Sequence, residues 1–209
     1  MWASVDTDNN VTKVYTRPTA ITYGDVNYPQ NVMSSWSNDE LATIKVYPAI
    51  TDSTNYEDPS YYINTDETFT YYDSVAINGI TYTNTVVGAY GTATPQSLDD
   101  TTTTTTDPDT GETTTTPGLK SNAISTQNHQ AYGLLEPSDW YVVRKSENGT
   151  AIPSDWDTWR ESIRTTYQQQ VVAINACTTV PEFQALFTPV GDPPVAPLPQ
   201  FPPSPDQTS

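Results

Sequence analysis

The first half of the chain alternates between apolar and polar residues, which is the period of a half-buried β-strand. Asn78-Gly79 separates two such runs, and both residues tolerate the positive φ angles of a type I′ turn. The pattern predicts antiparallel strands, two of them joined by this tight turn. The strand candidates cover residues 11–16, 21–28, 61–63, 68–72 and 80–87.

A short helix interrupts these strands. Ser37 is followed three residues later by Glu40, which is the spacing of a capping box, where each side chain bonds the backbone N–H of the other residue. We expect this helix to end before Tyr47-Pro48, because proline lacks a backbone N–H and keeps its neighbour out of the helical conformation.

The second half of the chain changes to the period of a helix. Residues 119–135 form one candidate, and a second helix begins at Ser154 and carries an apolar stripe about six turns long. Thr179 and Glu182 form another capping box, which opens a short helix through Phe187. The stripe, which we expect to be the helix core, consists of Trp156, Trp159, Ile163, Tyr167, Val171 and Ile174, and Cys177 continues it.

Two runs of threonine, Thr101–Thr106 and Thr113–Thr116, flank a Pro-Asp-Thr-Gly turn and predict a protruding β-hairpin. A hairpin with no apolar face is not stable by itself. We therefore expect it to add strands to the sheet edge of another chain, because backbone pairing requires no particular side chain. The interaction residues that this hypothesis assigns are Thr101, Thr106, Thr113 and Thr116.

Eight prolines occur in the last 21 residues. A segment of this composition is typical of polyproline II or disordered chain, and we expect it to fold onto nothing by itself. We expect it to lie extended in a groove of a neighbouring chain. The contact residues would be Pro193, Pro197, Pro199 and Phe201.

These segments predict an α+β protein in three parts. Residues 1–117 form an antiparallel β module that includes the hairpin at 101–116, residues 118–188 form a helical hairpin, and residues 189–209 form the extended Pro-rich tail. Charge changes near the same boundary, since residues 1–119 hold sixteen acidic and three basic residues, against nine and five in the remainder.

The charge balance excludes some classes of partner. The chain carries a net charge of −17, with eight Lys and Arg residues in all, so it lacks the clustered cations that nucleic acid or an anionic membrane surface requires. No apolar run is long enough to span a membrane, and the N-terminus has no signal-peptide pattern, so we expect a soluble protein made in a cytoplasm. With 35% apolar residues, the core is thin, and we expect neighbouring chains to contribute to stability.

Candidate chemistry is sparse. Cys177 lies on the apolar stripe and is interpreted as a small hydrophobe, and His129 is interpreted as a solvated helix residue. The segment Asp107–Glu112 departs from the calcium-loop spacing because its glycine stands at position 5 rather than 6. Acidic pairs such as Asp155/Asp157 suit helix starts. We therefore predict no catalytic residue, no cofactor, no metal site and no enzymatic activity.

Two stretches carry a family resemblance. The first runs from Arg17-Pro18 through Gly24-Asp25-Val26-x-Tyr28-Pro29 to Trp36-Ser37-x-x-Glu40-Leu41-x-x-Ile44-x-Val46-Tyr47-Pro48. The second is Ala131-Tyr132-x-Leu134-Leu135-x-Pro137-x-Asp139-Trp140-Tyr141-Val142-Val143-Arg144, continued by Ile152-Pro153-x-x-Trp156, Arg160-x-x-x-Arg164 and Thr179-Val180-x-Glu182-Phe183. In this pattern of aromatics and prolines, over residues 15–50 and 119–187, the chain resembles small virion or tail-fibre-region proteins of tailed bacteriophages, frequent in marine and proteobacterial phages.

The resemblance implies a structural role and brings no catalytic residues. The first hypothesis is a non-enzymatic subunit of the phage virion, in the tail, baseplate or fibre-attachment region and assembled in the host cytoplasm. Its partners would be other phage structural proteins and copies of itself. The alternatives are a tail-fibre assembly chaperone absent from the virion, and an adsorption module that binds a host surface glycan through Tyr61, Tyr62, Tyr71 or Tyr72.

Overall fold

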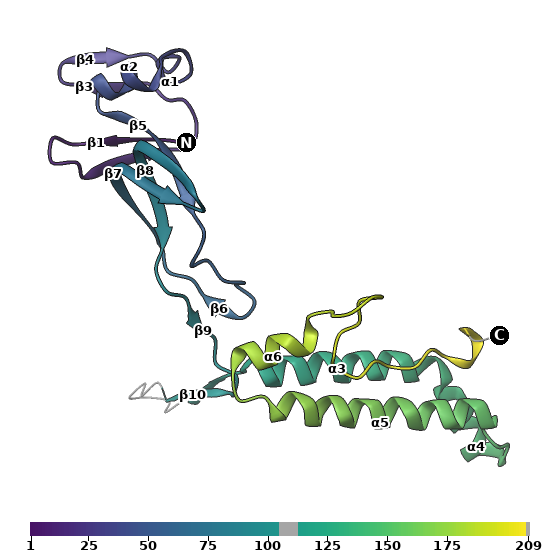
Figure 1. Ribbon diagram of the computed structural model, residues 1–209. Coiled ribbons are helices and arrows are strands. Elements are labelled where there is room, and N and C mark those ends of the chain that lie inside the picture. The colour runs from purple at the N-terminus through teal and green to yellow at the C-terminus, as the bar shows by residue number, and fades with distance from the viewer. Residues whose placement is uncertain (105–112, 208–209) are drawn as a thin grey trace. The chain divides into compact units, whose positions relative to one another are not determined.

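The computed structural model describes residues 1–104 and 113–207 (Figure 1), so Thr106 and the turn between the threonine runs lie outside the described residues. The described chain combines an N-terminal sheet with C-terminal helices, which confirms the predicted α+β class. It divides into two compact units, Met1–Thr94 and Pro95–Ser209.

The first unit contains a five-stranded sheet with the strand order β2-β1-β5-β8-β7. Its strands are β1 (Trp2–Val5), β2 (Val11–Tyr15), β5 (Val46–Asp52), β7 (Glu67–Ile77) and β8 (Ile80–Tyr90). The smaller elements are β3 (Ile21–Tyr23), β4 (Val26–Tyr28), α1 (Val32–Ser35), α2 (Asn38–Thr43), β6 (Tyr62–Ile63) and β9 (Thr94–Pro95).

The prediction of a purely antiparallel module was wrong at the centre of this sheet. β5 pairs with β8 in parallel, with Ala49 opposite Val86, whereas the other neighbouring strands of this sheet pair antiparallel. β5 was missing from the predicted strands because Pro48 marks a stop in the sequence pattern. In the structure Pro48 lies inside the strand, opposite Trp2 of β1.

β5 is central because its two faces belong to different apolar clusters. Val46 packs with Leu41 and Met33, and the next residue, Tyr47, packs with Val86 and its neighbours. Successive side chains of a strand point to opposite faces, so the strand is covered on both sides. This burial explains why the central strand carries a run of apolar residues rather than an alternation.

Two local predictions for the first unit are confirmed. Asn78 and Gly79, with φ angles of 51° and 78°, make the turn between β7 and β8. At the start of α2, the backbone N–H of Ser37 donates to Oε2 of Glu40 at 2.7 Å, and the N–H of Glu40 donates to the Ser37 hydroxyl at 3.3 Å. Both features depend only on residues close in sequence.

The second unit is helical apart from the threonine hairpin. In Figure 1, α3 runs alongside α5, and the two helices pack together as the predicted helical hairpin requires. α4 was not predicted, because none of its residues is buried and no apolar stripe marks it. The elements are β10 (Thr101–Thr104), β11 (Thr113–Thr116), α3 (Leu119–Leu135), η1 (Glu136–Ser138), α4 (Asp139–Asn148), α5 (Ser154–Ala176), α6 (Val180–Phe187) and η2 (Pro205–Gln207).

The division between the units lies upstream of the boundary predicted near residues 117–118. The backbone N–H groups of Leu119 and Lys120 donate to the carbonyls of Ser97 and Leu98, each at 3.0 Å. These are N–H groups of the first turn of α3, which have no partner inside the helix. The threonine hairpin therefore belongs to the helical unit and not to the β module.

The apolar stripe of α5 forms the core of the helical unit. Ala131 of α3 packs against it, and Cys177 is also buried, although it follows the helix as its C-cap residue. Of the six stripe residues, Trp159, Ile163 and Ile174 are buried, and Trp156, Tyr167 and Val171 are half-buried.

The Pro-rich tail packs against its own helices, so the prediction that it folds onto nothing by itself was wrong. Leu198 is buried, and Phe201 packs against the cluster of Ala131, Trp159 and Ile163. Figure 1 shows the tail, in yellow, running along the helices of this unit. Prolines remove backbone donors, but their rings and the residues between them still supply apolar surface to bury.

Replacing Ile163 by alanine removes a side chain that is 0% exposed. We expect the helical unit to lose about 2–5 kcal/mol of unfolding free energy, because the cavity adds to the lost burial. Urea denaturation followed by circular dichroism at the helix band measures this loss. Val172→Ala on the same helix, where the side chain is 69% exposed, is the matched control and should change stability by less than about 0.5 kcal/mol. Equal losses in the two variants would contradict the assignment of the core.

Candidate functional site

The threonine hairpin forms one candidate interaction surface. β10 and β11 pair antiparallel, with Thr101 opposite Thr116 at the base. The side chains of Thr101, Thr113 and Thr116 are exposed, and the hydroxyls of Thr102 and Thr115 lie 3.5 Å apart. Among the described residues this sheet has two strands. The outer edge of each strand therefore presents backbone N–H and C=O groups to a partner.

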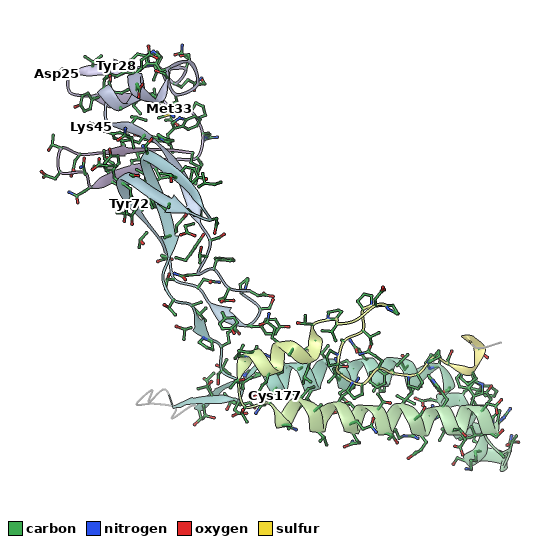
Figure 2. All side chains as sticks on the ribbon, in the orientation of Figure 1. Asp25, Tyr28, Met33, Lys45, Tyr72 and Cys177 are labelled. Atoms are coloured by element: carbon green, nitrogen blue, oxygen red, sulfur yellow. The ribbon has the colours of Figure 1, made fainter. Side chains whose placement is uncertain are left out.

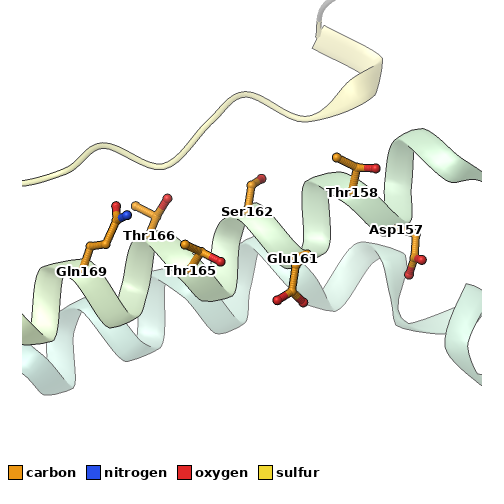
Figure 3. Close-up of a pocket in the computed structure, with 7 residues that line it drawn as sticks. All are labelled: Asp157, Thr158, Glu161, Ser162, Thr165, Thr166 and Gln169. Carbon is orange, nitrogen blue, oxygen red and sulfur yellow. The ribbon is translucent and has the colours of Figure 1, made fainter.

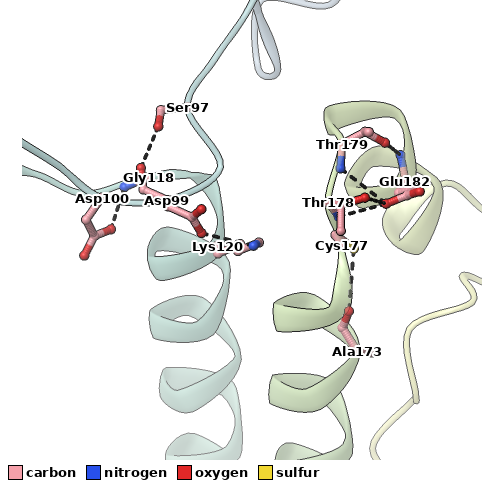
Figure 4. A network of polar contacts seen from close by, with 10 residues as sticks. All are labelled: Ser97, Asp99, Asp100, Gly118, Lys120, Ala173, Cys177, Thr178, Thr179 and Glu182. Atoms are coloured by element: carbon pink, nitrogen blue, oxygen red, sulfur yellow. Dashed lines mark hydrogen bonds and ion pairs between the residues drawn. The ribbon is translucent and has the colours of Figure 1, made fainter.

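Polar contacts close the base of the hairpin (Figure 4). Asp100 Oδ1 accepts from the N–H of Gly118 at 2.8 Å, and Lys120 Nζ lies 3.0 Å from Asp99 Oδ1. Hydrogen bonds from the Ser121 side chain and from the Gly118 N–H lower the pKa of Asp100. A Cβ atom at Gly118 would lie 2.5 Å from the backbone carbonyl of Asp99, so the close approach of these two backbone segments requires glycine at this position. We call Asp99, Asp100, Gly118 and Lys120 the hairpin clasp.

Glu182 holds the turn between α5 and α6. Its Oε2 accepts from the N–H and the hydroxyl of Thr178, at 2.8 and 2.9 Å, and from the N–H of Thr179 at 3.2 Å (Figure 4). These bonds, those from Thr178 first, lower the pKa of Glu182. The N–H of Glu182 donates to the Thr179 hydroxyl in return, which confirms the second predicted capping box.

Cys177 lies beside this turn, in surroundings that disfavour a reactive thiolate. Its Sγ donates to the carbonyl of Ala173 at 3.5 Å. Burial, followed by the charge of Glu182, raises the pKa of the thiol. A thiol with a raised pKa stays protonated near neutral pH and is a poor nucleophile.

Arg160 joins three helical elements, and sequence reasoning gave it no role. The guanidinium is buried and donates to the carbonyl of Leu135 at 2.9 Å, to the hydroxyl of Ser138, and to Asp139 Oδ1 at 2.7 Å. Leu135 ends α3, where carbonyls lack helical partners and attract positive charge. Asp139 begins α4, where negative charge is favoured. One side chain of α5 therefore bonds both the end of α3 and the start of α4.

Aromatic rings gather where α4 meets α5. Trp140 stacks on Tyr141 at 4.0 Å between ring centroids, and Tyr141 lies 5.6 Å from Trp156. The Arg144 guanidinium lies 4.7 Å from the Trp140 ring centroid, a cation–π contact. Trp140 is still 51% exposed. Next to these rings is a depression of about 540 Å³, lined by Gly133, Leu134, Pro137, Trp156, Trp159, Phe201, Pro202, Pro203, Ser204 and Asp206.

The Pro-rich tail occupies a groove on the helices. The indole Nε1 of Trp159 donates to the carbonyl of Pro202 at 3.1 Å, and Nε2 of Gln170 donates to the carbonyl of Pro199 at 2.7 Å. Gln170 was also missed, although it lies seven residues after Ile163, on the period of the stripe. Of the four residues predicted as tail contacts, Pro199 and Phe201 are half-buried in this groove, and Pro193 and Pro197 are exposed.

A second depression follows the outer face of α5 (Figure 3). It measures about 670 Å³ and is lined by Asp157, Thr158, Glu161, Ser162, Thr165, Thr166 and Gln169. All these residues belong to one helix, and none is buried. It is a polar helix surface without converging groups from a second element.

The four tyrosines proposed for glycan binding do not share one environment. Tyr71 packs into the core beside Tyr47, with ring centroids 4.6 Å apart, and its hydroxyl donates to Asn84 Oδ1 at 2.9 Å. Burial is the first cause that raises the pKa of Tyr71 to about 12. Tyr72 is exposed (Figure 2), and Tyr61 and Tyr62 are half-buried.

Residues 1–104 and 113–207 contain no group of three or more His, Cys, Asp or Glu side chains placed to hold a metal ion. In the same residues, no helix is both long and apolar enough to cross a membrane. His129 is exposed on α3. Comparison with known proteins finds no family model, no curated protein and no solved structure that matches this chain.

Replacing Arg160 by alanine leaves the buried Ser138 hydroxyl oxygen and Asp139 Oδ1 without this donor. The Leu135 carbonyl loses one of its two donors and keeps the hydrogen bond from the Ser138 hydroxyl at 2.8 Å. We expect the helical unit to lose about 2 kcal/mol or more, because a buried acceptor without a partner keeps its full desolvation cost. Chemical denaturation measures the loss. Arg164→Ala is the control, since Arg164 is exposed and lies 3.6 Å from Glu161, and surface pairs contribute less than about 1 kcal/mol. A neutral Arg160→Ala variant would refute the role of Arg160 as a junction.

The lowered pKa of Glu182 predicts an acid-sensitive turn. A carboxylate whose pKa is lower in the folded than in the unfolded chain stabilises the fold above its ordinary value of 4.5, and this contribution is lost as the pH falls through the folded value. We expect Glu182→Gln to lower the thermal midpoint of the helices at pH 6, and the difference from the unmodified chain to shrink as the pH falls below about 4.5. Glu161→Gln is the control. A difference that stays constant with pH would contradict the role of the Glu182 charge.

Proposed function

We propose that this chain is a non-enzymatic structural subunit of a bacteriophage virion, located in the tail, baseplate or fibre-attachment region. It acts by protein–protein interaction. The resemblance of residues 15–50 and 119–187 to tail-region proteins of tailed phages supports the virion as the setting. The geometry of the helical unit supports the mode of action.

The observation that carries the proposal is the two-stranded threonine hairpin. All its cross-strand pairs are threonine opposite threonine, so it has no apolar face to pack on a core. Two-stranded hairpins are marginally stable in water, whereas a third strand from a partner adds a ladder of backbone hydrogen bonds. The clasp fixes the base of the hairpin to α3. The threonine hairpin is therefore fixed at its base to its own chain, and its strand edges remain available to pair with a strand of another chain.

The exposed side of the helical unit offers a second contact surface. α4 buries none of its residues and exposes Trp140, Val142 and Val143, and α3 exposes Tyr132. Tryptophan, tyrosine and arginine are the residues most enriched where protein interfaces gain their binding energy. This surface and the hairpin belong to the same unit, which we assign as the docking part of the subunit.

The first experiment is quantitative mass spectrometry of gradient-banded phage particles, with the portal protein as the internal standard. A fixed copy number at a symmetric multiple, such as about 3, 6 or 12, supports a tail subunit, because closed rings have rotational symmetry. Copies in the hundreds would move the chain to the capsid surface. Absence from particles, with abundance in the infected lysate, would replace the proposal by the assembly chaperone.

Lysines on the hairpin test its role in incorporation. In Thr102→Lys/Thr114→Lys, each strand carries one charged side chain, and the two lysines are not register partners. Lysine is the residue by which natural sheets block edge pairing, whereas two lysines directly opposite each other would open the hairpin itself. We expect at least about a tenfold loss of copies per particle, equivalent to about 1.4 kcal/mol of binding, with unchanged helix content. The control Ser125→Lys/Asn128→Lys adds the same charge at exposed positions of α3. Equal incorporation of the two variants would remove the hairpin from the interface.

A further inference from the structure

The groove that holds the tail has the chemistry of a receptor for proline-rich chain. Two side chains of α5, Trp159 and Gln170, donate to the carbonyls of Pro202 and Pro199. The N–H of Leu198 donates to the carbonyl of Leu186 in α6 at 3.0 Å. The tail therefore runs antiparallel to α5, and it is held by donors from two helices.

The contacts repeat every three residues. The two carbonyls that accept hydrogen bonds belong to Pro199 and Pro202, and the two apolar anchors are Leu198 and Phe201. A polyproline II helix has three residues per turn, so positions three apart lie on one face. Aromatic rings with an indole N–H aimed at a carbonyl are the means by which known modules bind such segments. The contacts of the tail therefore recur at the spacing of one polyproline II turn, with Leu198 and Phe201 as the apolar anchors.

The chain's own tail does not fill this groove completely. Gln170 is 2% exposed, and its Oε1 is buried without a hydrogen-bond partner among the described residues. It lies beside a cavity of about 210 Å³, lined also by Gln127, Gln130, Phe187, Ala196, Leu198, Gln200 and Phe201. A tail that settles deeper, or one residue further along, can bring a non-proline N–H to this oxygen.

The connector before the anchors is bonded to itself and exposes its apolar side chains. Val190 and Val195 bond each other's backbone in both directions at 3.0 Å, and both side chains are more than half exposed. The buried anchors of the segment follow this connector. Exchange of such a segment between copies is a low-cost route to association, because the second copy makes the same contacts.

Charge permits a second copy to dock through the tail. The chain carries a net charge of −17, but residues 193–205 contain no charged side chain. Two acidic copies repel each other over most of their surfaces, whereas the neutral tail can enter a neighbour's groove without bringing like charges together.

We propose that the groove formed by α3, α5 and α6 accepts the Pro-rich tail of a second copy of this chain, so that neighbouring subunits exchange tails. This inference rests on the proposed function in one respect, since a virion places copies side by side at high local concentration. It names the partner as the same chain and the binding surface as the tail groove.

The test uses the purified full-length chain with a photoreactive benzoylphenylalanine in place of Gln200, which is exposed beside the anchors. Equal amounts of isotopically heavy and light protein are mixed and irradiated, and crosslinked peptides are identified by mass spectrometry. We expect residue 200 to crosslink to peptides of the helices, with heavy–light pairs that increase as the protein concentration approaches about 1 mM, the effective concentration that a short linker provides.

The control places the same photoreactive residue in a Leu198→Ala/Phe201→Ala chain, where heavy–light pairs should fall at least about tenfold, equivalent to about 1.4 kcal/mol. Same-isotope crosslinks alone at every concentration would show that the groove serves only its own tail, and would overturn the proposal. Heavy–light pairs that persist in the anchor variant would show non-specific contact, with the same consequence. None of these results changes the copy number in particles, so the proposed function is judged separately.

Discussion

The helical unit depends on covering a single apolar stripe. α5 presents Trp159, Ile163 and Ile174 along one side, and α3 alone does not cover them. The tail completes the cover with Phe201 and Leu198. Among the described residues α6 also packs against α5, but it is a helix of only eight residues. Burial of apolar area supplies most of the favourable free energy of folding, so the fold of this unit extends to its last proline-rich segment, and the tail belongs to the core.

Prolines in the tail reduce the number of backbone N–H groups that are buried without a partner. An extended chain laid into a groove buries backbone groups that have no ladder to pair with, and each buried donor without a partner is costly. Proline has no N–H, so the tail brings mainly carbonyls, and the Trp159 and Gln170 donors satisfy two of them. Arg160 satisfies the carbonyl at the end of α3 in the same way. In both places a polar side chain of α5 donates to a backbone carbonyl that lies outside the interior of a helix or a sheet.

The parts of the fold that could be predicted are those fixed by neighbouring residues. Both capping boxes, the Asn78-Gly79 turn and the start of α5 follow from local rules, and the structure contains them. The parallel pairing of β5 with β8 could not be predicted, because local sequence does not determine which distant strand pairs with β5. The prediction for the tail failed for a related reason, since the side chains that donate to it, Gln170 and Trp159, lie 29 and 43 residues upstream of the carbonyls they bond. Of the candidate site, the threonine strands were visible in sequence, whereas the clasp that ties them to α3 and the role of Arg160 appear only when distant residues meet.

Because every described pair of the threonine hairpin is the same, the length of the hairpin can change independently of the rest of the helical unit. Each cross-strand pair of the described hairpin is the same, so a shift of one strand by two residues recreates identical pairs on identical faces. The clasp at Asp100 and Gly118 is then what distinguishes one register from another. Two further threonines in each strand would lengthen the hairpin by about 7 Å and leave the clasp, the helices and the net charge as they are. Adding or removing threonine codons would therefore change the length of the hairpin without requiring a compensating change in the helices that carry it.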